Sequence, residues 1–235
     1  TIVQPRLELT GPTSISIDGR LARPVAITVP PASARRVREV VEYNTSTGGS
    51  PASIFIEYFG MLDEEDSFGQ FYTAQVGSSA EEGEFSTVFT SIWAEPGSVP
   101  GQRFTDSPYV YNTVFVPSLS GFSTGFEHEV DPAELAAVEN DYAQSTPGLD
   151  GTTVDFGIPI AITGFIFGAD LPVHLPARRT SYYTTQETIW STEFFERSGG
   201  SSVETELVPA NIPVTLEPGS TTRVQWNRGV IGPSL

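Results

Sequence analysis

The side-chain types that most often perform catalysis are scarce in this sequence. Its 235 residues include two histidines, His128 and His174, and contain neither cysteine nor lysine. A disulfide, a thiol nucleophile, a Schiff base and a phosphate-loop lysine are therefore all excluded within this chain. A zinc site built from histidine and cysteine is equally disfavoured. We interpret His174 as a packed or turn residue, and His128, which lies between two glutamates, as a solvated surface residue.

Carboxylates are abundant instead, with 29 Asp and Glu residues. A carboxylate pair can cleave a glycosidic bond, and Glu57 is the strongest candidate because its neighbours in the run Ile54–Phe59 are apolar. An edge residue or an arginine partner is the simpler interpretation. The acidic cluster at residues 63–66, and Asp150 with Asp155, could bind calcium, but neither has EF-hand spacing, and a solvated acidic loop accounts for them.

No recognisable catalytic motif accompanies these residues. The sequence has no Gly-x-Ser-x-Gly elbow, phosphate loop, His-Glu-x-x-His or dinucleotide fingerprint. We therefore expect a protein that is not an enzyme and that has no cofactor and no metal site.

The charge balance indicates a solution of high salt concentration. The formal net charge is −17, and all 12 basic residues are arginine, although lysine is ordinarily a common residue. At a salt concentration of 1 M the Debye length is roughly 3 Å, so carboxylates repel one another little, and a large net charge keeps the chain soluble. These features predict a halophilic protein. The alternative is an ordinary acidic protein from an arginine-rich genome.

Basic residues are concentrated near the start of the chain. Residues 1–38 carry six arginines and two acids, whereas the rest is strongly acidic. Such asymmetry favours contact with an acidic surface, such as a neighbouring subunit or lipid headgroups, and specific nucleic-acid binding is not expected. The alternative is that these arginines pair with acids of the same chain. The six candidate assembly contacts are Arg6, Arg20, Arg23, Arg35, Arg36 and Arg38.

Short strands must position all of these side chains. Alternating or β-branched runs, separated by Gly and Pro turns, predict about eight strands before residue 130 and about six after residue 150. The resulting fold class is all-β, a jelly roll or β-sandwich, with two stacked β-barrel units. The expected strands cover residues 13–17, 25–29, 37–43, 53–59, 71–76, 85–93, 109–116, 119–126, 153–167, 181–195, 203–208, 212–216 and 222–226.

One short helix interrupts the strands. Asp131, Pro132 and Glu134 form a capping pattern that predicts a helix through about Asn140. We place a jelly-roll barrel at residues 1–128, the helix and a connector at 129–149, and a second barrel at 150–235; a discontinuous first barrel with the second inserted is the alternative. Residues 28–37 also align without a gap on 215–224, since both read as strand, Pro-x-Ser turn and strand, and this weakly suggests duplication.

A lysine-free acidic chain of about 25 kDa with many strands and no catalytic motif resembles a known family. It is similar to the larger major capsid protein of haloarchaeal icosahedral viruses with an internal membrane. The resemblance covers the whole chain in size and composition but has no diagnostic motif. It implies a vertical single jelly roll with a second barrel stacked on it, homodimers, and heterodimers with a smaller sister capsid protein. It also implies a location in the virion capsid, above the internal membrane.

Two other classes compete with this interpretation. A halophilic adhesin or carbohydrate-binding module would present a line of exposed aromatic side chains, which Tyr109, Tyr111, Tyr182 and Tyr183 could supply. A secreted glycoside hydrolase would depend on one carboxylate such as Glu57. The capsid interpretation instead predicts oligomers that form in molar salt and dissociate on dilution.

Overall fold

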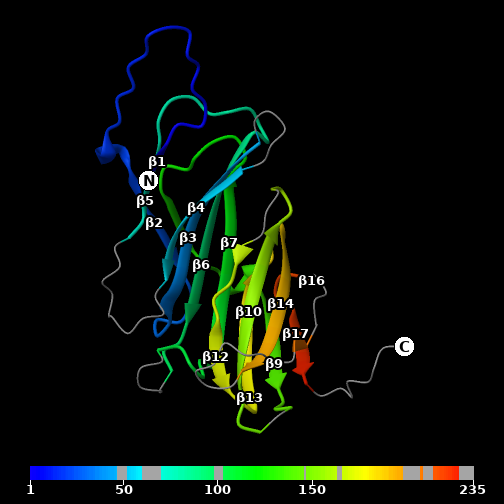
Figure 1. Ribbon diagram of the computed structural model, residues 1–235. Coiled ribbons are helices and arrows are strands. Elements are labelled where there is room, and N and C mark those ends of the chain that lie inside the picture. Colours follow the sequence, from blue (N-terminus) through cyan, green and yellow to red (C-terminus); the bar gives the residue numbers. More distant parts are fainter. Residues whose placement is uncertain are drawn as a thin grey trace.

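The computed structural model is all-β, as the sequence predicts (Figure 1). It describes residues 1–46, 52–59, 70–97, 103–145, 147–162, 166–197, 207–208 and 214–227. Within these residues the strands form three sheets. Helical structure there is limited to single 3₁₀ turns at Gly19–Leu21 and Pro132–Glu134.

A long central sheet is the main structural element. It contains seven strands in the order β17 (Thr221–Trp226), β9 (Leu135–Tyr142), β13 (Ala177–Thr184), β7 (Tyr109–Ser118), β6 (Phe85–Ala94), β3 (Arg35–Thr45) and β4 (Ala52–Phe59).

Two smaller sheets accompany it. One has the order β1 (Ile2–Val3), β5 (Tyr72–Gln75), β2 (Arg23–Thr28) and β8 (Phe126–Glu129). The other is built on β10 (Asp150–Pro159) and β14 (Thr188–Arg197), joined by β11 (Ile166–Phe167), β12 (Leu171–His174), β15 (Leu207–Val208) and β16 (Val214–Thr215).

The two smaller sheets cover opposite faces of the central sheet. Because side chains alternate along a strand, Phe89 of β6 points toward β2 and β8 and stacks on Phe126 with ring centroids 5.1 Å apart. Its neighbour Val88 points the other way and packs with Trp190 of β14. Both Phe89 and Val88 are fully buried, so the fold is a three-layer β-sandwich with a core on each side of the central sheet.

Most of the expected strands are present, but four predictions are wrong. The run at 153–167 is divided into β10 and β11, with a turn that begins at Ile160. Residues 13–17 and 119–125 do not form strands, since both segments lack a neighbouring strand to pair with. The long run at 181–195 is divided into β13 and β14 by a turn at residues 185–187. At that turn Glu187 has a positive φ of 49°.

The helix predicted through Asn140 is also wrong. Asp131 does cap a first turn, accepting a hydrogen bond from the Ala133 N–H at 2.8 Å. The chain then becomes extended at Leu135, with φ −101° and ψ 146°, and enters β9. Pairing with β13 on one side and β17 on the other outweighs the helix signal.

Strand β9 also changes the expected domain layout. The segment 129–149 was expected to connect two barrels, yet it supplies a strand inside the central sheet. Strand β13 further pairs directly with β7 in parallel. Residues 1–128 and 150–235 therefore share one sheet, and the boundary predicted between them does not separate two sheets.

The two segments that align in sequence, residues 28–37 and 215–224, make the same kind of connection between sheets. Residues 28–37 lead from β2 in the four-stranded sheet to β3 in the central sheet. Residues 215–224 lead from β16 in the other outer sheet to β17 in the central sheet. Each crosses through a tight turn, closed by the hydrogen bonds Ala34 N to Pro31 O and Ser220 N to Glu217 O.

Candidate functional site

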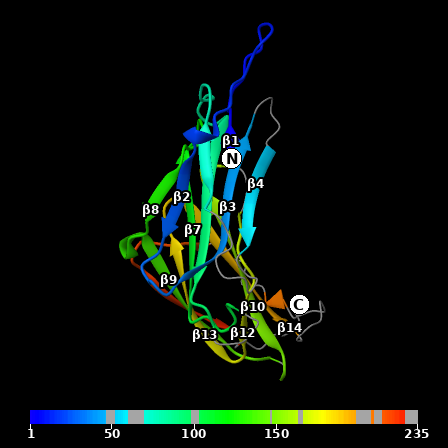
Figure 2. The ribbon, with the colours of Figure 1, turned by 90° about the vertical axis from the view of Figure 1, so that its left-hand side faces the viewer.

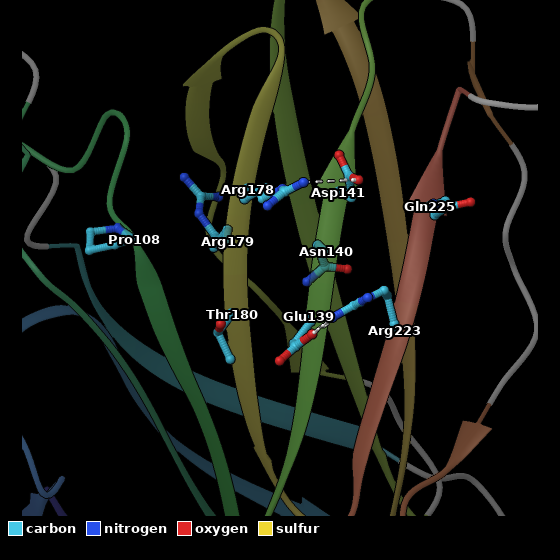
Figure 3. Close-up of a pocket in the computed structure, with 9 residues that line it drawn as sticks. All are labelled: Pro108, Glu139, Asn140, Asp141, Arg178, Arg179, Thr180, Arg223 and Gln225. Carbon is cyan, nitrogen blue, oxygen red and sulfur yellow. Dashed lines mark hydrogen bonds and ion pairs between the residues drawn. The ribbon is translucent and has the colours of Figure 1, made fainter.

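A polar hollow of about 550 Å³ lies on the part of the central sheet formed by β13, β9 and β17 (Figure 3). Strand alternation places every second side chain of these strands on this face. The side chains that share this parity are Glu139, Asp141, Arg178, Thr180, Arg223 and Gln225; Pro108 and the buried residues Asn140 and Arg179 complete the lining.

The charges of this hollow are paired with one another across the strands. Arg223 lies opposite Glu139 in the sheet register and donates to its Oε2 through Nε at 3.1 Å and Nη2 at 2.7 Å. Arg178 lies opposite Asp141, with 4.0 Å between Nη2 and Oδ2. Because opposite charges already neutralise each other here, the hollow offers no free acid–base pair, and its chemistry suits a polar contact surface.

Arg179 lies beneath the hollow and joins two sheets. Its side chain is 2% exposed and points away from Arg178, between the central sheet and β12. It donates to the carbonyl oxygens of Ser107, Leu171 and Pro172 at 3.0, 2.9 and 3.0 Å, and to the Thr153 hydroxyl at 3.2 Å. A guanidinium can satisfy several acceptors at once because of its forked donors. We assign this residue a structural role.

A buried carboxylate belongs to the same polar layer. Asp155 is 4% exposed and accepts hydrogen bonds from Asn112 Nδ2 at 3.0 Å, Tyr183 Oη at 2.8 Å and Thr192 Oγ1 at 2.6 Å. Burial raises the pKa of Asp155 above its ordinary value, and the three hydrogen bonds and Arg179 oppose that rise. Asp150 has the opposite parity on β10 and so lies on its other face, which means that the strand separates the two carboxylates considered for calcium.

The six arginines near the start of the chain make intramolecular contacts. Four have a carboxylate partner: Arg6 pairs with Glu8 and Glu81, Arg20 with Asp18, Arg36 with Glu39, and Arg38 with Glu57. Arg23 and Arg35 donate to nearby backbone carbonyl groups. The alternative of pairing within the chain is thus realised for four of them, while a role in assembly stays a prediction.

Glu57 does have an arginine partner, as its simpler interpretation proposed. Arg38 Nη2 donates to Glu57 Oε1 at 2.6 Å and Nη1 donates to the Gly168 carbonyl at 2.5 Å. The sequence did not single out Glu42, a buried neighbour on β3. Burial raises the pKa of Glu42, hydrogen bonds from Asn44 and Ser53 lower it, and the Glu57 charge adds to the rise.

The two histidines are separated and each has a carboxylate partner. His174 Nδ1 lies 2.6 Å from Asp106 Oδ2, and this hydrogen bond raises the pKa of His174 above 6.5. His128 Nε2 lies 2.9 Å from Glu134 Oε2, and its ring packs against Phe115. Both arrangements match turn or surface histidines.

The four tyrosines do not form an exposed line. Tyr111 and Tyr183 are 6% and 2% exposed and point into opposite cores. Tyr111 stacks on Tyr182 at 4.5 Å between ring centroids, and Tyr109 meets Tyr111 edge-on at 5.7 Å. Burial and the two neighbouring phenols raise the pKa of Tyr111 to about 12. Only Tyr109 and Tyr182 of the four are partly open to solvent.

Two further observations concern the described residues alone. No cluster of three or more His, Asp or Glu side chains in them is arranged to hold a metal ion; the acidic cluster at 63–66 lies outside them. In the same residues, no helix has both the length and the apolar character needed to span a bilayer.

The surface feature that sequence reasoning missed is an apolar arm. Residues 4–22, between β1 and β2, form this N-terminal arm, which extends beyond the end of the sheets (Figures 1 and 2). It exposes five large aliphatic side chains, by 44% to 68%: Leu7, Leu9, Ile15, Ile17 and Leu21. The alternation at residues 13–17 is the available signal, but it predicts a strand rather than an exposed arm.

Comparisons with known proteins found no relative. No protein-family model matches the chain, and neither does any curated protein or solved structure.

Proposed function

We propose that this protein is a structural subunit of an assembled shell that operates in concentrated salt, of the kind formed by the major capsid proteins of halophilic viruses. In this proposal the subunit forms dimers and capsomers, together with a smaller sister protein, over an internal membrane. The virion is the proposed location.

One observation carries the proposal. Five large aliphatic side chains are exposed on a single projecting arm, while the chain as a whole has a net charge of −17. Contiguous exposed apolar surface marks sites of association. Acidic bodies repel one another in dilute salt, and concentrated ions remove that repulsion, so assembly of such a subunit requires salt.

The side chains with catalytic potential support this proposal through the partners they have. Arg179 and Asp155 form hydrogen bonds between sheets. In the hollow Arg223 pairs with Glu139, and Glu57 pairs with Arg38. These are contacts that stabilise a fold.

The test is the molar mass in solution as a function of salt. Light scattering after gel filtration should give dimers or larger species in molar KCl, and electron microscopy of the concentrated material should show ordered assemblies. Dilution into low salt should dissociate them. A monomer throughout the salt range would overturn the proposal.

A second candidate, glycoside hydrolysis, is favoured by one specific observation. Glu42 of β3 and Glu57 of β4 lie on the same face of paired strands, burial and the Glu57 charge raise the pKa of Glu42, and a pair of neighbouring carboxyl groups is what glycosidases use. Glu57→Gln would abolish turnover of a polysaccharide panel if this candidate holds. The matched control is Glu193→Gln, on the outer sheet.

A further inference from the structure

We propose that the N-terminal arm of one copy adds as an extra strand to the free edge of β4 in a second copy. The proposal rests on the proposed function and deepens it, since it names the contact through which subunits associate.

The arm has the pattern of a strand without a partner. Leu7 and Leu9 on one leg, and Ile15 and Ile17 on the other, recur at every second residue, so each leg has one apolar face when extended. All four side chains are exposed. Throughout the described part of the chain, the arm pairs with no strand. Residues 18–22 use backbone groups in the turn at Gly19–Leu21 and in hydrogen bonds from Arg23. The backbone N–H and C=O groups of the two legs, residues 7–9 and 13–17, lie outside every strand pairing that the structure describes and can bond to a neighbouring molecule.

Strand β4 has the matching features. It is the last strand of the central sheet and pairs with β3 on one side, and no strand of the described residues lies on its other side. Ile54 and Ile56 project from one face of β4 and are 47% and 36% exposed. Natural proteins usually protect such an edge with proline, with charge or by covering it. The one charged residue of β4, Glu57, pairs with Arg38 instead.

Charge further favours contact between these two surfaces. The arm contains two arginines, Arg6 and Arg20, and two acids, Glu8 and Asp18, so its net charge is zero. The acidic charge of β4 is likewise compensated by Arg38. In a chain of net charge −17, two neutral apolar surfaces can meet without carboxylate repulsion, whereas the rest of the molecule carries the whole acidic excess.

The direction of the arm indicates that its partner is another molecule. The arm leaves the end of the four-stranded sheet and extends away from the body in both views (Figures 1 and 2). Strand addition at an open edge combines main-chain hydrogen bonds with side-chain packing at alternate positions. Ile15 and Ile17 would pack beside Ile54 and Ile56.

The first test uses charge substitutions in the full-length protein in molar KCl. Ile17→Glu in the arm and Ile54→Glu in β4 should each raise the dimer dissociation constant at least about tenfold. The matched control, Ile160→Glu, changes an equally exposed isoleucine, 62% accessible, in the turn after β10, and should leave that constant unchanged. Circular dichroism of each variant establishes that it is folded.

The second test exploits the absence of cysteine from the native chain. Ile17→Cys and Ile54→Cys are prepared as separate proteins, mixed and oxidised; the mixture should give a disulfide-linked dimer in excess of that from either protein alone. Ile17→Cys mixed with Ile160→Cys should not.

The two proposals fail in different ways. If the wild-type protein assembles with salt but Ile17→Glu and Ile54→Glu assemble equally well, or the arm cross-links to position 160 as readily as to 54, the arm contact is refuted and the shell function stands. If the wild type remains a monomer in molar salt, both proposals are refuted.

Discussion

Replacement of the buried Arg179 by methionine should be among the most destabilising single changes in the molecule. Methionine fills a similar volume but donates no hydrogen bond. The carbonyl groups of Ser107, Leu171 and Pro172 would each lose a donor. Leaving a buried acceptor without a partner costs about 1–3 kcal/mol.

The net effect is smaller than the sum of these losses. Removing a buried guanidinium also recovers its desolvation penalty, which amounts to several kcal/mol. We therefore expect Arg179→Met to lower the free energy of unfolding by about 3 kcal/mol. Arg179→Lys keeps the charge but loses the forked geometry and should be intermediate.

The neighbouring residue provides a matched control. Arg178 precedes Arg179 on β13, yet its side chain is 85% exposed on the opposite face, so Arg178→Met should change the free energy of unfolding by less than about 0.5 kcal/mol. Urea unfolding at constant molar KCl, followed through the fluorescence of buried Trp190 and Trp226, measures both variants. Equal midpoints for Arg178→Met and Arg179→Met, or a more stable Arg179→Met, would refute the assigned role of Arg179 in joining the sheets.

Three further predictions concern titration and backbone geometry. NMR titration should give His174 a pKa above 6.5, and Asp106→Asn should lower that pKa. The pair stabilises the fold at pH values below 6.5 and ceases to do so as the pH rises through the raised pKa of His174. An unchanged pKa in the variant would contradict this. Because burial raises the pKa of Asp155, the wild type should gain stability relative to Asp155→Asn as the pH falls through that raised value toward 3.8, and parallel urea midpoints across that pH range would count against it. Gly125→Ala should lower the melting temperature more than Gly83→Ala. Both glycines have a positive φ, but only at Gly125 would a new Cβ approach another atom, Arg23 Cβ, at 2.5 Å. Equal melting temperatures would show that the steric contact adds nothing to the backbone strain that the two sites share.

The fold class could be predicted from the sequence because β-branched and aromatic runs mark most strands. The order of layers could not. Strand β6 is buried along nearly its whole length because both faces of the central sheet are covered, and burial on both faces removes the alternation that would identify a core face. The predicted boundary between two barrels therefore does not coincide with a boundary between sheets, since one sheet contributes to both cores.

The helix error has a related cause. The capping residues correctly predicted the turn at Pro132–Glu134, but Leu135 to Val138 is apolar without a clear period and fits a doubly covered strand as well as a helix. Pairing with β13 and β17 then decides the conformation. Propensity is a weak indicator where tertiary pairing is available.

The buried site residues were hidden for a different reason. The pair Arg178-Arg179 looks like any surface dipeptide until a strand is assigned to it. Alternation then places Arg178 in the hollow and Arg179 between the sheets. Glu42 was likewise indistinguishable among 29 acids, and Asp155 stood out only as a possible calcium ligand with Asp150, because the neighbours that bury both residues are distant in sequence.

The use of arginine inside the molecule explains why association should depend on salt. Near the start of the chain, in the hollow and beneath it, the described arginines form ion pairs with carboxylates or donate to carbonyls of their own chain. Cations that satisfy internal acceptors are not available to a partner, so two copies approach each other with a formal net charge of −17 each and repel one another. Dissolved ions must then screen that repulsion, and the attraction has to come from apolar surface. Salts that are excluded from the protein surface strengthen apolar contacts. Such salts therefore both screen the repulsion between the acidic bodies and favour burial of Leu9 and Ile17 of the arm.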